Sequence, residues 1–266
     1  TALGVYRMVI TFSMMIGPPL SVYFIRSSGY EAFFLFYSLI GAGAFIGVMT
    51  LPKEPAHAYG SGAGHSEIRF REIFTLFKMP TVSSSYMGIL LGSAFGGILM
   101  TYVSLYVERY TGIPNPAFFF TLYAGIGALS SAGIGRLSDH YGRRTFVLPS
   151  MLVMASGILL LVFLPRFPWM VFILSALLTG VGYHAVLAIF VARVVDGADR
   201  RMKATALAFQ ESSIDLGVSV GIFLFGLVSV LFSYPVLFAA LACVAAAAPV
   251  LVLSTDGGGE VVRGDR

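Results

Sequence analysis

Eight apolar runs constrain what this chain can fold into more than any other feature. A helix needs about 20 mainly apolar residues to cross the hydrocarbon of a membrane. The sequence therefore predicts an all-α, polytopic membrane protein with about eight transmembrane helices. We place them at about 2–25, 31–51, 82–107, 117–135, 146–164, 169–193, 204–232 and 235–253.

The composition excludes a soluble domain. Hydrophobic residues make up 57% of the chain and charged residues only 11%, whereas soluble domains have about 45–50% and about 25%. The net charge is +4, but the basic residues lie in short turns and form no continuous face for nucleic acid. The single cysteine, Cys243, excludes an intramolecular disulfide and a cysteine-based metal site.

One long polar stretch, 53–80, separates the second and third apolar runs. It contains three glycines at 60, 62 and 64, which indicate a flexible part. The following residues, 66–74, alternate charged and apolar side chains and predict a short amphipathic helix on the membrane surface. We interpret the stretch as a linker between two helical bundles.

The basic residues predict the orientation in the membrane. With the 135–145 turn in the cytoplasm, 14 of the 17 lysines and arginines lie inside, and only Arg26, Arg109 and Arg166 lie outside. Positive charge is retained on the cytoplasmic side. We therefore expect the linker 53–80 and the C-terminal tail 255–266 to be cytoplasmic, and the protein to lie in the plasma or inner membrane.

A short charged segment, 135–144, lies between the fourth and fifth runs. Its physical interpretation is a tight cytoplasmic turn, because glycine permits close approach and unusual backbone angles. It also resembles the loop motif of the major facilitator superfamily, G-x-L-(A/S)-D-x-x-G-R-(K/R). The matching residues are Gly135, Leu137, Asp139, Gly142, Arg143 and Arg144. The resemblance implies that this loop gates the cytoplasmic side.

A weak internal repeat agrees with that resemblance. A shift of 204 residues aligns 1–3 with 205–207, Gly17 with Gly221 and Tyr30 with Tyr234. The two halves of these transporters are related by such parallel repeats. The chain thus resembles helices five to twelve of a twelve-helix member and looks N-terminally incomplete. The implied domains are the last two helices of the first bundle (1–52), the linker (53–80), a six-helix C-terminal bundle (81–254) and a tail (255–266).

The first run carries part of a second motif. Gly17 and Pro18 match the antiporter motif of helix five, G-x-x-x-G-P-x-x-G-G, whereas Ser13 replaces its first glycine and its last two glycines are also absent. In the family the proline kink accompanies export in exchange for protons. The alternative is a packing kink with no bearing on the direction of transport.

Glycines and tyrosines mark further helix contacts. Gly88, Gly92 and Gly96 recur every fourth residue and predict a flat face for a neighbouring helix. Gly217 and Gly221 are candidates for the same role. Tyr86 and Tyr102 either line a cavity or anchor helix interfaces.

Glu211 and Asp215 are the sharpest functional candidates. They are four residues apart and therefore share a helix face. Counted from Lys203, they lie about 12 Å and about 18 Å deep. Acids at such depth are costly and usually mark an ion or substrate path. The alternative is a structural pair hydrogen-bonded by Gln210 and the neighbouring serines.

His184 lies inside the sixth run, where it could relay protons or simply be a satisfied core residue. No second histidine or cysteine has metal-ligand spacing, so we predict no metal site. No catalytic triad or phosphate loop is recognisable, so we predict no enzyme and no cofactor.

The predicted function is secondary active transport, with proton-coupled efflux of small organic molecules by alternating access. The alternatives are a proton-driven importer of a sugar or organic acid, and a non-transporting scaffold or inactive transporter. The predicted partners are the lipid bilayer, a small-molecule substrate and protons, with no obligate protein partner. We also expect Asp139 to contact Arg7 and the first helix as a latch when the cavity faces outward.

Overall fold

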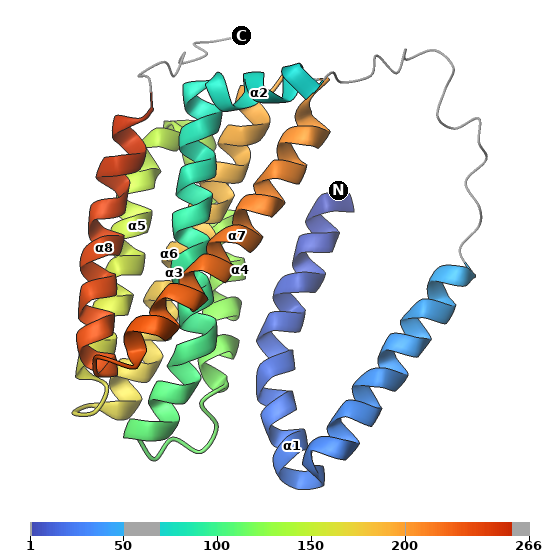
Figure 1. Cartoon of the computed structure of the whole chain (residues 1–266), viewed down its shortest axis with the longest axis vertical. Coiled ribbons are helices and arrows are strands. Elements are labelled where there is room, and N and C mark those ends of the chain that lie inside the picture. The colour runs from blue at the N-terminus through green and yellow to red at the C-terminus, as the bar shows by residue number, and fades with distance from the viewer. Residues whose placement is uncertain (1, 51–69, 200, 257–266) are drawn as a thin grey trace.

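The computed structural model describes residues 2–50, 70–199 and 201–256, without the side chains of 2–8 and 70–73. Within that part the chain is helical and holds seven helices long and apolar enough to cross a membrane (Figure 1). The expected all-α polytopic architecture is confirmed. The elements are α1 (Ala2–Met49), α2 (Phe70–Lys78), α3 (Pro80–Tyr110), α4 (Phe118–Tyr141), α5 (Arg143–Leu160), the short 3-10 helix η1 (Leu161–Phe163), α6 (Pro168–Gly197), α7 (Lys203–Ser229) and α8 (Tyr234–Ser254).

The first two predicted spans form one helix with a sharp break. Gly29 has a φ of 78° inside α1, which L side chains rarely adopt. The break turns α1 into two arms that diverge like a V (Figure 1). The shift of 204 residues places Gly29 on Ser233, the residue that precedes α8. The repeat therefore aligns two helix pairs at their turns.

Helices α3 to α8 form one bundle with α3 and α6 near its centre. Helix α6 packs against α3, α4 and α5, whereas α3 also packs against α7 and α8. The glycines that recur every fourth residue on α3 lie against large side chains of α6. Gly88 faces Phe190, Gly92 faces Val186 and Gly96 faces Tyr183.

The turn predicted for 135–144 is largely helical. Helix α4 continues to Tyr141 and α5 begins at Arg143, so Gly142 alone makes the turn, with a φ of 90°. Gly135 lies inside α4, and a Cβ on it would meet nothing within 4 Å. A tight turn between the two helices is present, but it is shorter than predicted, because charge marks where the hydrocarbon ends and a helix can continue past that level.

Helix α2 lies across one end of the bundle (Figure 1). Its described residues, Phe70–Lys78, overlap the predicted segment 66–74, of which residues 66–69 are outside the described part. Leu76 is fully buried, and the ring of Phe77 contacts Tyr86 of α3 and Phe209 of α7. The helix is therefore fastened to the ends of α3 and α7.

Candidate functional site

One face of α7 carries the two membrane-level acids. Glu211 and Asp215 are both exposed, and no described residue pairs with the Asp215 carboxylate. The opposite face packs on α3, where Gly217 lies against the backbone of Leu90 and Gly221 against that of Ala94. The acids therefore project away from the six-helix bundle that holds their helix.

Gln210 connects the buried face of α7 to the acidic one. Its side chain is fully buried, and its Nε2 donates a hydrogen bond of 3.0 Å to Oε1 of Glu211. Its Oε1 has no hydrogen-bond partner within the described part of the chain. This arrangement holds one Glu211 oxygen at the edge of the bundle, so the acid is positioned by a fixed donor.

Tyr86 and Tyr102 fasten α3 to α7. The Tyr86 hydroxyl donates to the carbonyl oxygen of Ala206 at 3.0 Å, and the Tyr102 hydroxyl donates to that of Ile222 at 3.1 Å. Tyr86 is buried, and Tyr102 is half-buried beside Phe225. These two hydroxyls hold α7 near its start and in its second half, and the acids Glu211 and Asp215 lie in sequence between the two acceptor residues.

His184 lies between α4 and α6 rather than on the acidic face. Its Nδ1 is 3.0 Å from the carbonyl oxygen of Gly180, and its ring lies edge-on to Tyr123. Gly127 of α4 has no room for a side chain, because a Cβ there would overlap the imidazole. No hydrogen bond joins His184 to Asp215 among the described residues. The structure does not bring these two predicted residues together.

The ends of α4, α5, α6 and α8 meet in an ion-pair network. Nη2 of Arg143 lies 2.9 Å from Oδ1 of Asp139, and Nε of Arg143 lies 3.0 Å from Oδ2 of Asp196. Oδ2 of Asp256 lies 2.5 Å from Nη2 of Arg193 and 3.6 Å from Nε of Arg144. The motif arginines therefore hold α5 to α4, α6 and the end of α8.

Arg193, Asp196 and Asp256 are members that sequence reasoning missed. The sequence predicts that the basic residues lie in short turns, but Arg193 lies within α6 and is only 2% exposed. The expectation was wrong because α6 continues to Gly197. The sequence held one signal of this buried ion pair. Arg193 ends the apolar run 169–193, and the oppositely charged Asp256 follows the last apolar run, 235–253.

Helix α1 meets α4 at the end opposite the network. The Thr121 hydroxyl donates to the carbonyl oxygen of Met15 at 2.8 Å, and Nδ2 of Asn115 donates to that of Pro19 at 3.3 Å. Arg26 donates to the carbonyl oxygen of Pro114. On the α4 side, these three hydrogen bonds all involve residues in the first half of α4 or in the loop before it.

Gly17 and Pro18 of α1 have no polar side chain that could donate such a hydrogen bond. Pro18 lies within the first arm of the helix, and a Cβ on Gly17 would meet nothing within 4 Å. The Arg7 side chain is outside the described part, so the predicted latch to Asp139 stays a prediction. Asp139 is paired with Arg143 in this structure.

No three histidine, cysteine, aspartate or glutamate side chains gather around a possible metal position in the described ranges.

The comparisons with known proteins agree with the helical architecture. The family model described as Major Facilitator Superfamily matches residues 114–261, which is more than half of the chain. A search of curated proteins found no match.

Proposed function

Because the chain belongs to the Major Facilitator Superfamily, a family of secondary membrane transporters, we propose that it exports small organic molecules in exchange for protons. The family points to a transporter rather than an enzyme. The proposed mechanism is alternating access, in which two helical bundles rock about a central substrate site. Glu211 and Asp215 are the residues that exchange protons for substrate.

The observation that carries this proposal is the acidic face of α7. Two carboxylates stand on an apolar helix about 12 Å and about 18 Å from its charged start, and the bundle leaves both exposed. Such residues are expensive in hydrocarbon and usually face a water-filled path. A carboxylate there can bind a proton or a cationic group, and binding one displaces the other.

The arrangement of α1 supports a gate at the network end. Its hydrogen bonds to α4 lie at the other end, as expected for a transporter that is closed on that side. In our proposal the network faces the cytoplasm, together with the linker 53–80 and the C-terminus. When the cytoplasmic side closes, Asp139 leaves Arg143 for Arg7 and the start of α1.

The proposed direction of transport, export, depends on a partial sequence motif in α1. Gly17 and Pro18 retain the centre of the antiporter motif, which favours export. A proton-driven importer would use the same acids with the opposite direction of substrate flow. A non-transporting scaffold would keep the fold without coupling protons to any substrate.

Vesicles with an acidic interior and inverted orientation separate these functions. With ethidium, a sugar and a carboxylic acid as probes, an exporter accumulates one of them and releases protons, which an internal pH dye reports. Glu211→Gln should abolish both signals. Ser212→Ala is the matched control, since Ser212 is the next exposed residue and its hydroxyl donates to the carbonyl oxygen of Ala208 in its own helix.

Each rival has a distinct outcome. Substrate entry together with protons into vesicles of native orientation, from an acidic medium, would identify an importer. Proton movement that no probe changes in either orientation would favour the scaffold. Full activity of Glu211→Gln would overturn the coupling role of the α7 face.

A further inference from the structure

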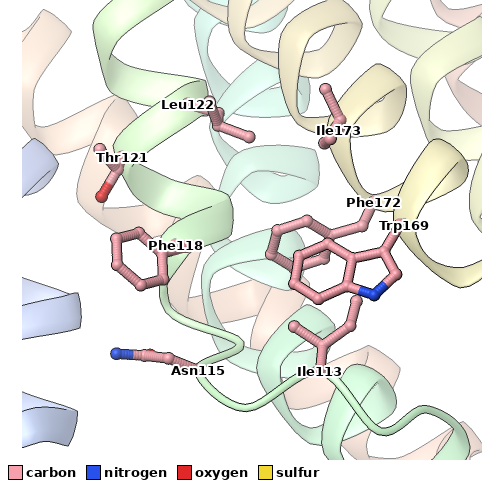
Figure 2. Close-up of a pocket in the computed structure, with 8 residues that line it drawn as sticks. All are labelled: Ile113, Asn115, Phe118, Thr121, Leu122, Trp169, Phe172 and Ile173. Atoms are coloured by element: carbon pink, nitrogen blue, oxygen red, sulfur yellow. The ribbon is translucent and has the colours of Figure 1, made fainter.

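An apolar site, separate from the acidic face of α7, lies at the ends of α4 and α6 that are opposite the ion-pair network. Figure 2 shows a pocket between the start of α4 on one side and the start of α6 on the other. Its volume is about 320 Å³. The side chains that form its apolar wall are Ile113, Phe118, Leu122, Trp169, Phe172 and Ile173.

Two polar side chains of the wall, Thr121 and Asn115, are already used elsewhere, whereas the indole of Trp169 belongs to an exposed side chain at the rim. The Thr121 hydroxyl donates to α1, as does Nδ2 of Asn115, whose Oδ1 accepts from the backbone N–H of Ala117 at 3.1 Å. A polar ligand would lose its hydrogen bonds with water and gain few in return. The pocket therefore selects a hydrocarbon group.

The exposed residues at the rim indicate whether the pocket opens toward lipid or toward water. Trp169 is 59% exposed and Phe118 is 53% exposed, and α3 lies behind the pocket on the side of the bundle interior (Figure 2). Trp169 is the second residue of α6, the level at which tryptophan is enriched at membrane interfaces. The pocket thus opens toward lipid, near the depth where head groups meet acyl chains.

Two arginines lie at about the same membrane depth as the rim of the pocket. Arg26 donates to the carbonyl oxygen of Pro114, the neighbour of Asn115 in the loop before α4. Arg166 is exposed and lies three residues before Trp169. Guanidinium groups bind phosphate through several N–H donors at once. Positive charge therefore flanks an apolar pocket at the membrane interface.

We propose that this pocket holds an acyl chain of a phospholipid from the adjacent leaflet, with the phosphate beside Arg26 and Arg166. A volume of about 320 Å³ equals that of about ten water molecules at about 30 Å³ each, which suits only the upper part of one chain. The bound lipid fills the wedge between α4 and α6 beside the contact of α1 with α4. The proposal is independent of the direction of transport and of proton coupling.

Trp169 is the only tryptophan of the chain, so its fluorescence reports on this pocket alone. The full chain is reconstituted in phosphatidylcholine vesicles that contain a minor share of phosphatidylglycerol brominated in its upper acyl chain. Bromine quenches a neighbouring indole. We expect half-maximal quenching at a lower mole fraction than random mixing gives, because the site concentrates the anionic lipid.

Matched variants test whether the pocket is the cause. Ile173→Phe fills it, and Leu122→Phe fills it from α4, so both should return quenching to the random-mixing value. Leu174→Phe is the control, since Leu174 is outside the pocket and is 42% exposed against 41% for Ile173. Arg26→Gln should keep the quenching but reduce the preference for the anionic lipid over brominated phosphatidylcholine.

Three results would overturn the proposal. Quenching of the unaltered chain could follow random mixing, or both pocket-filling variants could behave like Leu174→Phe. Tetraphenylphosphonium could protect Trp169 without any lipid selectivity, which would assign the pocket to an apolar solute instead.

Discussion

Arg193 and Asp256 are 63 residues apart in the sequence, yet their side chains meet at 2.5 Å. They are 2% and 8% exposed, and Nε and Nη1 of Arg193 have no partner within the described part of the chain. Removing one member of a buried ion pair typically costs about 3–5 kcal/mol, because the other charge stays buried. This single pair therefore matters for whether the residues that follow α8 stay attached to α6.

Asp256→Asn should lower the free energy of unfolding by about 3 kcal/mol, since it strands the Arg193 charge. Denaturant unfolding in detergent micelles measures it, with the exposed residue Asp199→Asn as the control. The double variant Arg193→Met with Asp256→Asn should recover much of the loss. An Asp256→Asn variant as stable as the control would show that Arg193 finds its counter-charge elsewhere.

Gly142 and Gly135 belong to the same motif but differ in backbone conformation. Gly142 has a φ of 90°, whereas Gly135 lies in α4 with open space around its Cα. Gly142→Ala should therefore cost about 1–3 kcal/mol as backbone strain, and Gly135→Ala should cost nothing or stabilise the helix slightly. Thermal unfolding of the two variants side by side tests this. Equal stability would mean that the turn relaxes to another geometry.

At the scale of elements, the interface between α3 and α7 depends on backbone contact. A Cβ on Gly217 would overlap the carbonyl oxygen of Leu90, so Gly217→Ala should force α7 outward and cost about 1–3 kcal/mol. Gly133→Ala makes the same chemical change on α4, where nothing lies within 4 Å. We expect this control to gain about 0.5–1 kcal/mol. A melting temperature lowered equally in both would argue against the close interface.

The elements were predictable from the sequence because a transmembrane helix is specified locally. A run of about 20 apolar residues marks its own position, and the centres of α3 to α8 were found in this way. The ends were not, since α4 continues through Asp139 to Tyr141 beyond the apolar run. Asp139 stands unfavourably near the negative end of that helix, and Arg143 compensates at 2.9 Å.

The site was predictable only in part, because contacts between distant residues leave no local pattern. The spacing of Glu211 and Asp215 placed both acids on one face of α7. Neither spacing nor composition joins Arg193 to Asp256, or separates His184 from that face. These outcomes depend on which helices pack together, and small residues such as Gly127 decide that by the side chains they admit.

At the scale of the whole molecule, alternating access requires α1 and α4 to separate at the end where they now touch. Sδ of Met15 lies 3.6 Å from the position of a Cβ on Gly125. In a Cys243→Ser background, Met15→Cys with Gly125→Cys can be joined by a short bismaleimide. We expect the cross-link to abolish substrate-driven proton movement, while the unlinked variant stays active.

A pair inside the six-helix bundle provides the control for that cross-link. The Tyr102 hydroxyl lies 2.6 Å from the position of a Cβ on Gly226, so Tyr102→Cys with Gly226→Cys spans α3 and α7. These helices move together if the bundle rocks as a rigid body, so linking them should leave activity at the level of the unlinked double variant. Activity that survives the α1–α4 link would show that this contact does not open during transport. Loss of activity with both links would instead mean that the bundle itself changes shape in the cycle, and rigid rocking would be wrong.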